Sequence, residues 1–341
     1  MPVYRSTQKV SDAALLNPVR PWPKMIRCDT ASGEFDVINK CLASNPHDKV
    51  IFAEGDSWFD KFTPLPLSGT NLLQEIRLPF STVVVDVSKV GDESGDMVKG
   101  LQAWRTEALF RYAMQGYDAI LLSAGGNDLK NLYAEKVRKY SEGGITPSEI
   151  SKMRRPSEYG DFFDGVVQNI IKFVEFRDKS KNPKTKNAPI ILHGYDYFQP
   201  RPAKASIFSG SRWGTGPWIY PVLKSVGFNS DEMRSAADAV VDQFNLMLAE
   251  KIAQLENVHV IDSRGILNPA AAGSTGASEH WLDEIHPSSA GFEKLARCCW
   301  NKPLAELMKF KINDADLDDA CLPATVSTAL AEPGPLTPVV A

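Results

Sequence analysis

The sequence lacks long apolar runs, and neither sign of charge is in clear excess. Its longest apolar runs, such as residues 82–85 and 189–192, have the length of a strand, whereas a membrane-spanning helix needs roughly 18 apolar residues. Lys and Arg total 38 against 42 Asp and Glu, a formal net charge of −4. These absences argue against a membrane span. They also argue against nucleic acid as a partner, because a positive field is what holds a polyanion.

Cysteine is scarce as well. The chain has 5 cysteines, an odd number, and no Cys-x-x-Cys spacing, a pattern that fits reduced thiols better than a disulfide scaffold or a structural zinc site. The first thirty residues contain no apolar stretch long enough for the core of a signal peptide. We therefore expect reduced cysteines, no bound metal and a cytoplasmic location.

What the sequence contains is an alternation of strand-like and helix-like segments. Hydrophobic residues make up 43% of the chain and charged residues 23%, as in ordinary globular proteins. Continuous apolar runs, typical of strands buried on both faces, occupy 50–54, 82–88, 119–123, 189–193 and 258–262. Helical patterns lie at 71–76, 96–114, 161–176, 231–255 and 288–299. This alternation predicts an α/β fold, a three-layer α/β/α sandwich around a central five-stranded parallel sheet.

Several segments lie outside that alternation. Residues 1–45 are expected to form an irregular N-terminal arm, and 46–312 the domain that carries the chemistry. Two segments within the domain, near 130–160 and 195–230, are expected to be long loop insertions. Residues 313–341 contain many Pro, Ala and Thr residues, so a disordered C-terminal tail is expected there. No internal repeat is found.

Chemically useful residues follow four of the predicted strands. Ligands of open α/β sheets bind outside the carboxyl ends of the strands, so these positions are inspected first. Ser57 belongs to a Gly-Asp-Ser sequence after the first strand, and Gly95 lies in a turn after the second. Asn127 follows two glycines after the third strand, and Asp283 and His286 lie beyond the fifth. The sheet is expected to bring them to one edge.

Together these residue types can perform acyl transfer. The hydroxyl of Ser57 is a weak nucleophile that needs a base, and His286 is the candidate because imidazole is the side chain whose ordinary pKa lies near neutral pH. Asp283 would fix the tautomer of that imidazole. The N–H groups of Ser57 and Gly95 and the amide of Asn127 would bind the oxyanion of a tetrahedral intermediate, a contribution of about 2.7–4 kcal/mol per donor. The pattern predicts a serine hydrolase.

The four blocks, in this order, resemble the SGNH (GDSL-type) esterase and lipase superfamily, named after its Ser, Gly, Asn and His. The resemblance covers about residues 48–300 and rests on these short blocks. It implies a flavodoxin-like sandwich, no metal or other cofactor, and hydrolysis of acyl esters through an acyl-enzyme. Gly91 competes for the second block, although the residues around Gly95 match better. Trp58 stands where the common motif has leucine, which concerns the shape of the acyl pocket.

The substrate is less defined by the sequence. Candidate substrate contacts are Trp58, Asp128, Tyr197 and Trp213, and the aromatic residues of the second insertion either roof an acyl pocket or pack that insertion onto the sheet. The charged run that starts at Lys130 is either a solvated face or a contact for an anionic head group. The expected partner is a small-molecule or lipid ester, and the oligomeric state is not predicted.

Two alternatives to a serine esterase of small esters remain open. One is a deacetylase of a sugar or another decorated polymer, and the other is a non-catalytic binding module on the same fold. The two histidines His280 and His286 do not predict a metal site. Their spacing of six residues fits no His-x-x-x-His pair on a helix, and no third ligand is evident.

Overall fold

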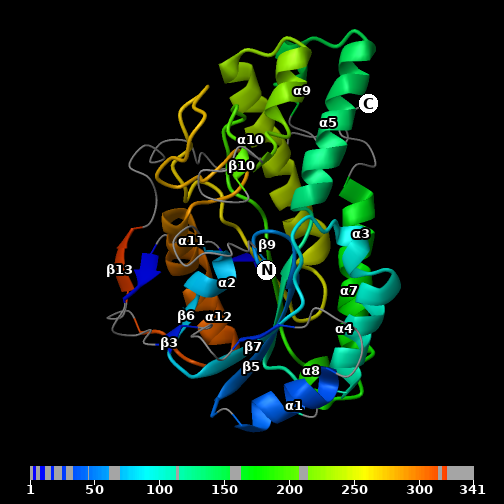
Figure 1. Cartoon of the computed structure of the whole chain (residues 1–341), viewed down its shortest axis with the longest axis vertical. Helices are drawn as coiled ribbons and strands as arrows, with labels where there is room; N and C mark the ends of the chain where they lie inside the picture. Colours follow the sequence, from blue (N-terminus) through cyan, green and yellow to red (C-terminus); the bar gives the residue numbers. More distant parts are fainter. Residues whose placement is uncertain are drawn as a thin grey trace, which may run out of the picture.

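The five strands predicted from the sequence all form, and they lie side by side in one parallel sheet (Figure 1). In the computed structural model, they are β5 (Lys49–Gly55), β7 (Thr82–Asp86), β8 (Ala119–Ser123), β9 (Ile190–His193) and β12 (Val258–Ile261). The short strands β1 (Val3–Tyr4) and β4 (Met25–Arg27) extend the two edges of the sheet to seven strands. The structure describes residues 3–4, 8–11, 17–18, 25–27, 34–44, 46–60, 70–112, 115–153, 163–206, 214–313 and 317–320.

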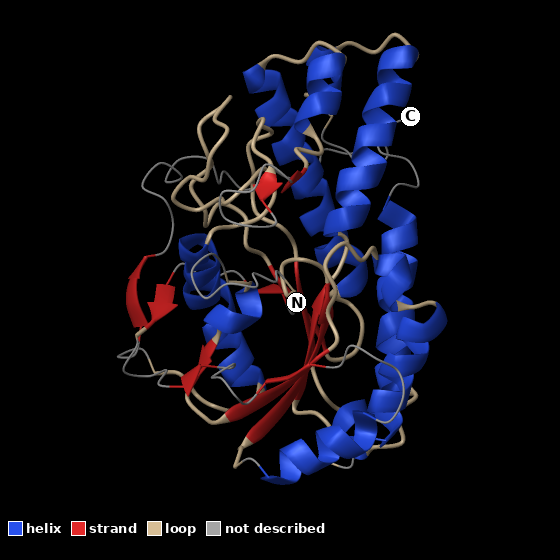
Figure 2. Ribbon diagram, in the orientation of Figure 1, coloured by secondary structure: helices blue, strands red, loops and turns tan. Residues whose placement is uncertain are grey.

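Helices cover both faces of this sheet, as Figure 2 shows. One layer contains α3 (Ser94–Met97), α4 (Gly100–Tyr112) and α7 (Asp164–Asp178). The other contains α2 (Leu72–Glu75), α11 (Ser289–Leu295) and α12 (Asn301–Leu307). Every residue of β7, β8 and β9 is buried, which is why these strands are apolar without alternation. The three-layer α/β/α sandwich is therefore confirmed.

The order of the strands is the flavodoxin-like one. Along the sheet the five main strands run β7, β5, β8, β9, β12, and all their pairings are parallel. The direction of winding reverses between β5 and β8, and such a switch point is where open α/β sheets bind ligands. The predicted blocks that contain Ser57 and Asn127 follow these two strands.

The first insertion is helical, so the expected loop near 130–160 is wrong over much of its length. Helix α5 (Gly126–Glu142) runs through it, followed by α6 (Pro147–Ile150), and residues 154–162 lie outside the description. Leu129, Tyr133 and Val137 recur every fourth residue and are buried, while of the charged residues between them Glu135 is exposed and Lys130 and Lys136 are half-buried. Dense charge on one face concealed this narrow apolar stripe in the sequence.

The second insertion contains short elements. They are the pair β10 (Ala205–Ser206) and β11 (Gly214–Thr215) and the helix α9 (Tyr220–Ser225), while residues 207–213 lie outside the description. Helix α10 (Ser230–Met247) follows, and the π-helical turn η2 (Leu248–Ile252) continues it. A similar π turn, η3 (Ala296–Trp300), joins α11 to α12.

The segments outside the main domain also contain regular structure. Helix α1 (Glu34–Ser44) lies within the range expected to be an irregular arm, and β3 (Asn17–Pro18) pairs with β6 (Arg77–Leu78). In the range expected to be a disordered tail, β13 (Leu317–Ala320) pairs with β2 (Gln8–Val10). The helix α8 (Pro183–Lys186) precedes β9. Residues 321–341 lie outside the description, and the domain boundaries stay a prediction.

One cysteine departs from the expectation. Cys298 is disulfide-bonded, so the prediction of reduced thiols is wrong for this residue. Disulfides are typical of oxidising compartments, and the cysteines therefore no longer support a cytoplasmic location, which stays a prediction. Within the ranges described above, no helix is both long enough and apolar enough to cross a membrane.

Candidate active site

Ser57 lies in a tight turn directly after β5, at the carboxyl edge of the sheet. The Asp56 carbonyl accepts hydrogen bonds from the N–H groups of Phe59 (3.1 Å) and Asp60 (3.0 Å), and its carboxylate accepts one from Trp58 N–H at 3.0 Å. The chain therefore bends sharply around Asp56. This bend places the Ser57 side chain in the wall of a cavity rather than in the core.

The structure brings Ser57 and His286, which are 229 residues apart, into direct contact. Ser57 Oγ lies 2.8 Å from His286 Nε2, and His286 Nδ1 lies 2.9 Å from each carboxylate oxygen of Asp283. Asp283 is fully buried and also accepts the backbone N–H of His286 at 2.9 Å. In this arrangement Nδ1 is the donor to Asp283, so Nε2 is free to take the Ser57 proton.

A buried arginine holds the turn that contains Asp283 and His286. Arg201 Nη2 donates to the Asp283 carbonyl at 2.8 Å, and Arg201 Nη1 donates to the Gly276 carbonyl. Arg201 has no exposed surface, and its cost of burial is offset by these bonds to carbonyl oxygens. Arg201 thus fixes the position of the turn that contains His286.

Asn127 reaches the same cavity from the start of α5. The N-cap residue Gly125 has φ = +105°, and a Cβ there would lie 2.6 Å from Phe244. At Gly126 a Cβ would lie 2.7 Å from the Tyr195 hydroxyl, so both positions require glycine. The Asn127 amide nitrogen donates to the Asp92 carbonyl at 2.9 Å, which uses one of its two N–H groups.

Gly95 is the second residue of α3, in the turn that Asn127 and Asp128 hold. Asp128 accepts hydrogen bonds from Ser94 N–H at 2.8 Å and from the Ser94 hydroxyl at 2.9 Å. The first N–H groups of a helix are not used within the helix, which leaves Gly95 N–H available. Gly95 is not among the residues that line the cavity next to Ser57, and its place in the oxyanion hole stays a proposal.

A network of polar side chains supports the turn that contains Ser57. The Asp56 carboxylate accepts the hydroxyl of Ser123 at 2.8 Å and that of Tyr195 at 2.6 Å. The Ser123 hydroxyl in turn lies 2.9 Å from His193 Nε2, and Trp58 stacks on the His193 ring with centroids 5.1 Å apart. Burial lowers the pKa of His193, although Asp56 opposes this change. This network fixes Asp56, and through Asp56 it fixes the bend at Ser57.

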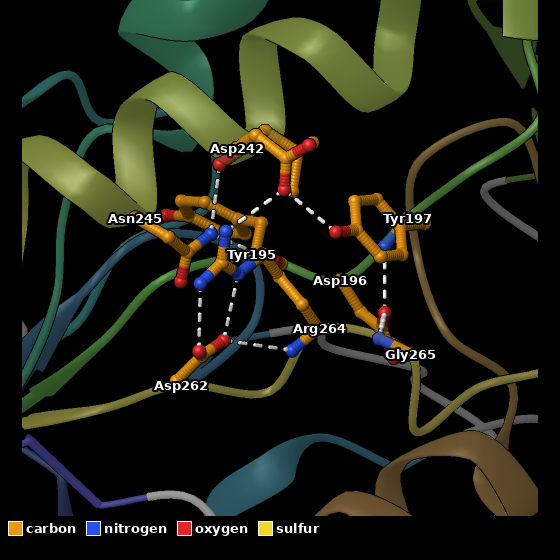
Figure 3. A network of polar contacts seen from close by, with 9 residues as sticks. Tyr195, Asp196, Tyr197, Asp242, Asn245, Asp262, Arg264 and Gly265 are labelled. Atoms are coloured by element: carbon orange, nitrogen blue, oxygen red, sulfur yellow. Dashed lines mark hydrogen bonds and ion pairs between the residues drawn. The ribbon is translucent and has the colours of Figure 1, made fainter. Parts of the chain in front are cut away.

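The structure places two of the expected substrate contacts away from the cavity. Figure 3 shows that the Tyr197 hydroxyl points to Asp242, to which it donates at 2.6 Å, and that Arg264 bridges Asp242 and Asp262. Asp128 is occupied by Ser94, as described above. Neither side chain lines the cavity, so each fits a supporting role better than contact with substrate. Trp213 lies outside the described residues.

The cavity beside Ser57 is narrow and mostly apolar. It has a volume of about 50 Å³ and lies between the turn that contains Ser57, α5, α10 and the 281–285 segment. Trp58, an expected substrate contact, lines it. The remaining lining residues are Asp56, Ser57, Gly126, Asn127, Leu129, Lys130, Tyr195, Asp196, Phe198, Ile219, Val240, Val241, Trp281 and Ile285. The Ser57 hydroxyl and the Asn127 amide thus meet at an apolar hollow, and the His286 imidazole contacts that hydroxyl, an arrangement suited to acyl transfer.

Residues 51–299 match the GDSL-like lipase/acylhydrolase family. The chain belongs to this family. It is therefore a hydrolase, as the sequence predicts. No curated protein matches the chain significantly.

Three similar solved structures have low sequence identity to the chain. The lipase Lip_vut3 from a goat rumen metagenome is 15% identical, covers 73% of this chain and 94% of its own, and has a TM-score of 0.41. A putative platelet activating factor from Streptococcus pneumonia is 16% identical, with 78% and 87% covered and a TM-score of 0.40. Axe2, an acetylxylan esterase from Geobacillus stearothermophilus, is 18% identical, with 77% and 95% covered and a TM-score of 0.37.

In this GDSL-like hydrolase, Glu284 has a task different from that of its neighbour Asp283. Its carboxylate accepts the backbone N–H groups of Trp218, Ile219 (3.0 Å) and Tyr220 (2.6 Å) at the start of α9. This clasp holds the Trp218 ring edge-on to His286, with centroids 5.6 Å apart. Burial raises the pKa of Glu284 to about 7, and the three N–H groups offset only part of that rise.

The raised pKa of Glu284 predicts a pH-dependent contribution to stability. Its pKa is about 7 in the folded state against an ordinary value of 4.5, so the contribution is present below pH 4.5 and is lost as the pH rises through 7. It amounts to on the order of 3 kcal/mol. Urea unfolding between about pH 5 and pH 8 should show the free energy of unfolding of Glu284→Gln falling less than that of the wild type.

The control for that experiment is the exposed neighbour Glu279. Glu279→Gln should follow the wild-type dependence on pH, because the Glu279 side chain is 73% exposed. If Glu284→Gln and the wild type lost stability in parallel between the two pH values, the predicted titration of Glu284 would be wrong.

Sequence reasoning singled out Ser57, Asp283 and His286, which the structure brings together, but it missed the residues that support them. Arg201 lies in a segment without any motif, and Glu284 occupies a position between Asp283 and His286 that the motif leaves unspecified. Asp196 also had no signal, yet it is fully buried and accepts hydrogen bonds from Gly265 N–H (2.6 Å) and Leu267 N–H (2.7 Å). The only signal that marks these three residues is that each is charged and buried. Burial is known only once the fold is known, so the sequence alone could not reveal it.

Proposed function

We propose that the chain is a serine esterase that hydrolyses a carboxylic ester through an acyl-enzyme, with Ser57 as nucleophile, His286 as base and Asp283 as orienting acid. The observation that carries this proposal is the continuous contact from Ser57 Oγ through the His286 ring to Asp283, with distances of 2.8 Å and 2.9 Å. Contacts of this kind are the signature of an activated hydroxyl.

The reaction would proceed in two halves. Ser57 Oγ attacks the carbonyl carbon of the ester while its proton moves to His286 Nε2, and Asp283 stabilises the imidazolium that forms. The N–H groups of Ser57, Gly95 and Asn127 would receive the oxyanion. The intermediate collapses, His286 returns the proton to the leaving alcohol, and water then attacks the acyl-enzyme with His286 again acting as base.

The cavity supports a short acyl group as the substrate's reacting part. A volume of about 50 Å³ is far below the roughly 300–1,000 Å³ of pockets that hold drug-sized ligands. Its walls include Leu129, Val240 and Ile285, which suit a small apolar group. The partner class is accordingly a small-molecule or lipid ester whose acyl group is short.

A panel of p-nitrophenyl esters of increasing acyl length tests this proposal. We expect kcat/KM to be highest for acetate or propionate and to fall by at least about 100-fold at octanoate, because a longer chain overpacks the cavity. Val240→Ala should extend the tolerated length. Ser57→Ala provides the background rate. A preference for octanoate would contradict the short acyl group, and hydrolysis of none of the esters would contradict the esterase.

A further inference from the structure

Lys130 brings a positive charge to the wall of the cavity. It lies in the first turn of α5, three residues after Asn127, and is half-buried among the cavity residues. Its Nζ donates to Asn127 Oδ1 at 2.9 Å and lies 5.5 Å from the centroid of the Trp218 ring. No carboxylate of a described residue lies within ion-pair distance of Nζ, although Glu93 and Asp56 act on it from farther away.

This placement costs stability, which indicates a functional reason for it. Taking an ammonium out of water is unfavourable unless a carboxylate pairs with it, and the neighbours of Lys130 are an amide oxygen and an aromatic ring. Burial accordingly lowers the pKa of Lys130. An ordinary surface lysine on α5, such as Lys139, instead pairs with Glu135 at 2.7 Å.

The two neighbours of the Asn127 amide allow only one orientation. Its nitrogen donates to the Asp92 carbonyl at 2.9 Å, and its oxygen accepts from Lys130 Nζ at 2.9 Å. A flipped amide would turn its oxygen toward the Asp92 carbonyl and its N–H groups toward the ammonium. Both contacts would be repulsive, so Asp92 and Lys130 together fix which atom of Asn127 lies where.

The ammonium also changes the strength of the amide as a donor. A hydrogen bond from a charged donor to the amide oxygen draws electrons away from the amide nitrogen. The N–H that Asp92 leaves unused becomes a better donor as a result.

We propose that Lys130 is a positioning residue of the oxyanion hole, which holds and polarises the Asn127 amide for the developing oxyanion. This inference rests on the proposed function, because it assigns Lys130 a role in the same acyl transfer. Lys130 acts through Asn127, so its effect belongs to turnover and not to the binding of a neutral substrate.

The test compares variants of Lys130 with p-nitrophenyl acetate, a neutral ester. Lys130→Met removes the charge and the donor, and we expect kcat to fall by about 10-fold while KM stays within about 2-fold. Lys130→Arg retains both features and should recover most of the loss. Lys136→Met is the matched control on the same helix, because Lys136 lies over the Tyr140 ring, 5.1 Å from its centroid.

A double-mutant cycle shows whether Lys130 acts through Asn127. Asn127→Ala should lower kcat by about 100-fold or more, with little change in KM. In that background, Lys130→Met should cost less than about 2-fold, because the amide it positions is gone. A full 10-fold cost in both backgrounds, or an effect on KM alone, would overturn the proposal, and the latter would point to direct contact with substrate.

A reaction-independent readout separates this inference from the proposed function. The side-chain amide signals of Asn127 in a ¹H–¹⁵N NMR spectrum are assigned by their loss in Asn127→Ala. Lys130→Met should shift them strongly, whereas Lys130→Arg and Lys136→Met should not. If the wild type hydrolysed no ester but the signals shifted, the esterase would be wrong and the contact would stand. Unshifted signals would refute the positioning role whatever the activity.

Discussion

Ser57→Ala should lower kcat for ester hydrolysis by at least about 10⁴-fold and leave the fold intact. The substitution removes one oxygen, whose hydrogen bond is the 2.8 Å contact with His286 Nε2. Without that oxygen no acyl-enzyme can form, and only hydrolysis assisted by the oxyanion donors and substrate binding remains. The measurement is the steady-state rate with p-nitrophenyl acetate, corrected for spontaneous hydrolysis.

Two controls separate chemistry from folding in this variant. The circular dichroism spectrum and the midpoint of urea unfolding should match those of the wild type, since a methyl group fits where the hydroxymethyl group was. A fluorophosphonate probe should label the wild type and not Ser57→Ala. Full activity of the variant would rule out Ser57 as the nucleophile, and labelling of a different residue would locate the true one.

Asp283→Asn should lower kcat by about 10³- to 10⁴-fold. The carboxylate of Asp283 accepts His286 Nδ1–H at 2.9 Å and the N–H of Ile285 at 3.0 Å. The oxygen of an asparagine can accept the backbone N–H of Ile285, but the N–H₂ group then takes the place of Oδ2, which lies 2.9 Å from His286 Nδ1. The imidazole then favours the tautomer with its proton on Nε2, where it cannot accept the proton of Ser57.

The burial of Asp283 calls for a measurement that does not depend on stability. The rate of fluorophosphonate labelling at low temperature should fall in proportion to kcat, while the unfolding midpoint shows that the variant is folded under assay conditions. Asp164→Asn is a suitable control, because Asp164 lies in an exposed ion pair with Lys251 and should not alter the rate. An Asp283→Asn enzyme with a wild-type labelling rate would remove Asp283 from the proposed mechanism.

The sheet and the order of the blocks were predictable because their signals are local. Each main strand is a short run buried on both faces, and Ser57, Asn127 and His286 each follow a strand or precede a helix. Parallel strands bring their carboxyl ends to one edge, so local signals were sufficient to predict a common site.

The supporting residues could not be predicted in the same way. The contact of Arg201 with Asp283 joins residues 82 apart, and that of Glu284 with Tyr220 joins residues 64 apart. Neither has a motif, since any buried carboxylate or guanidinium can serve if backbone groups face it. In the sequence, Lys130 was recognisable only as part of a charged run. Its proposed role depends on helix α5, and α5 was not predicted because its apolar stripe has only one residue per turn.

Asp283 and Glu284 are consecutive, yet one contacts the His286 imidazole while the other holds the backbone at Trp218, whose ring lies beside that imidazole. A small displacement of their turn would carry the imidazole and the Trp218 ring in the same direction, so the distance between the two rings would stay nearly unchanged. Replacing Trp218 therefore offers a way to change the surroundings of the imidazole while the contact between Asp283 and His286 is preserved.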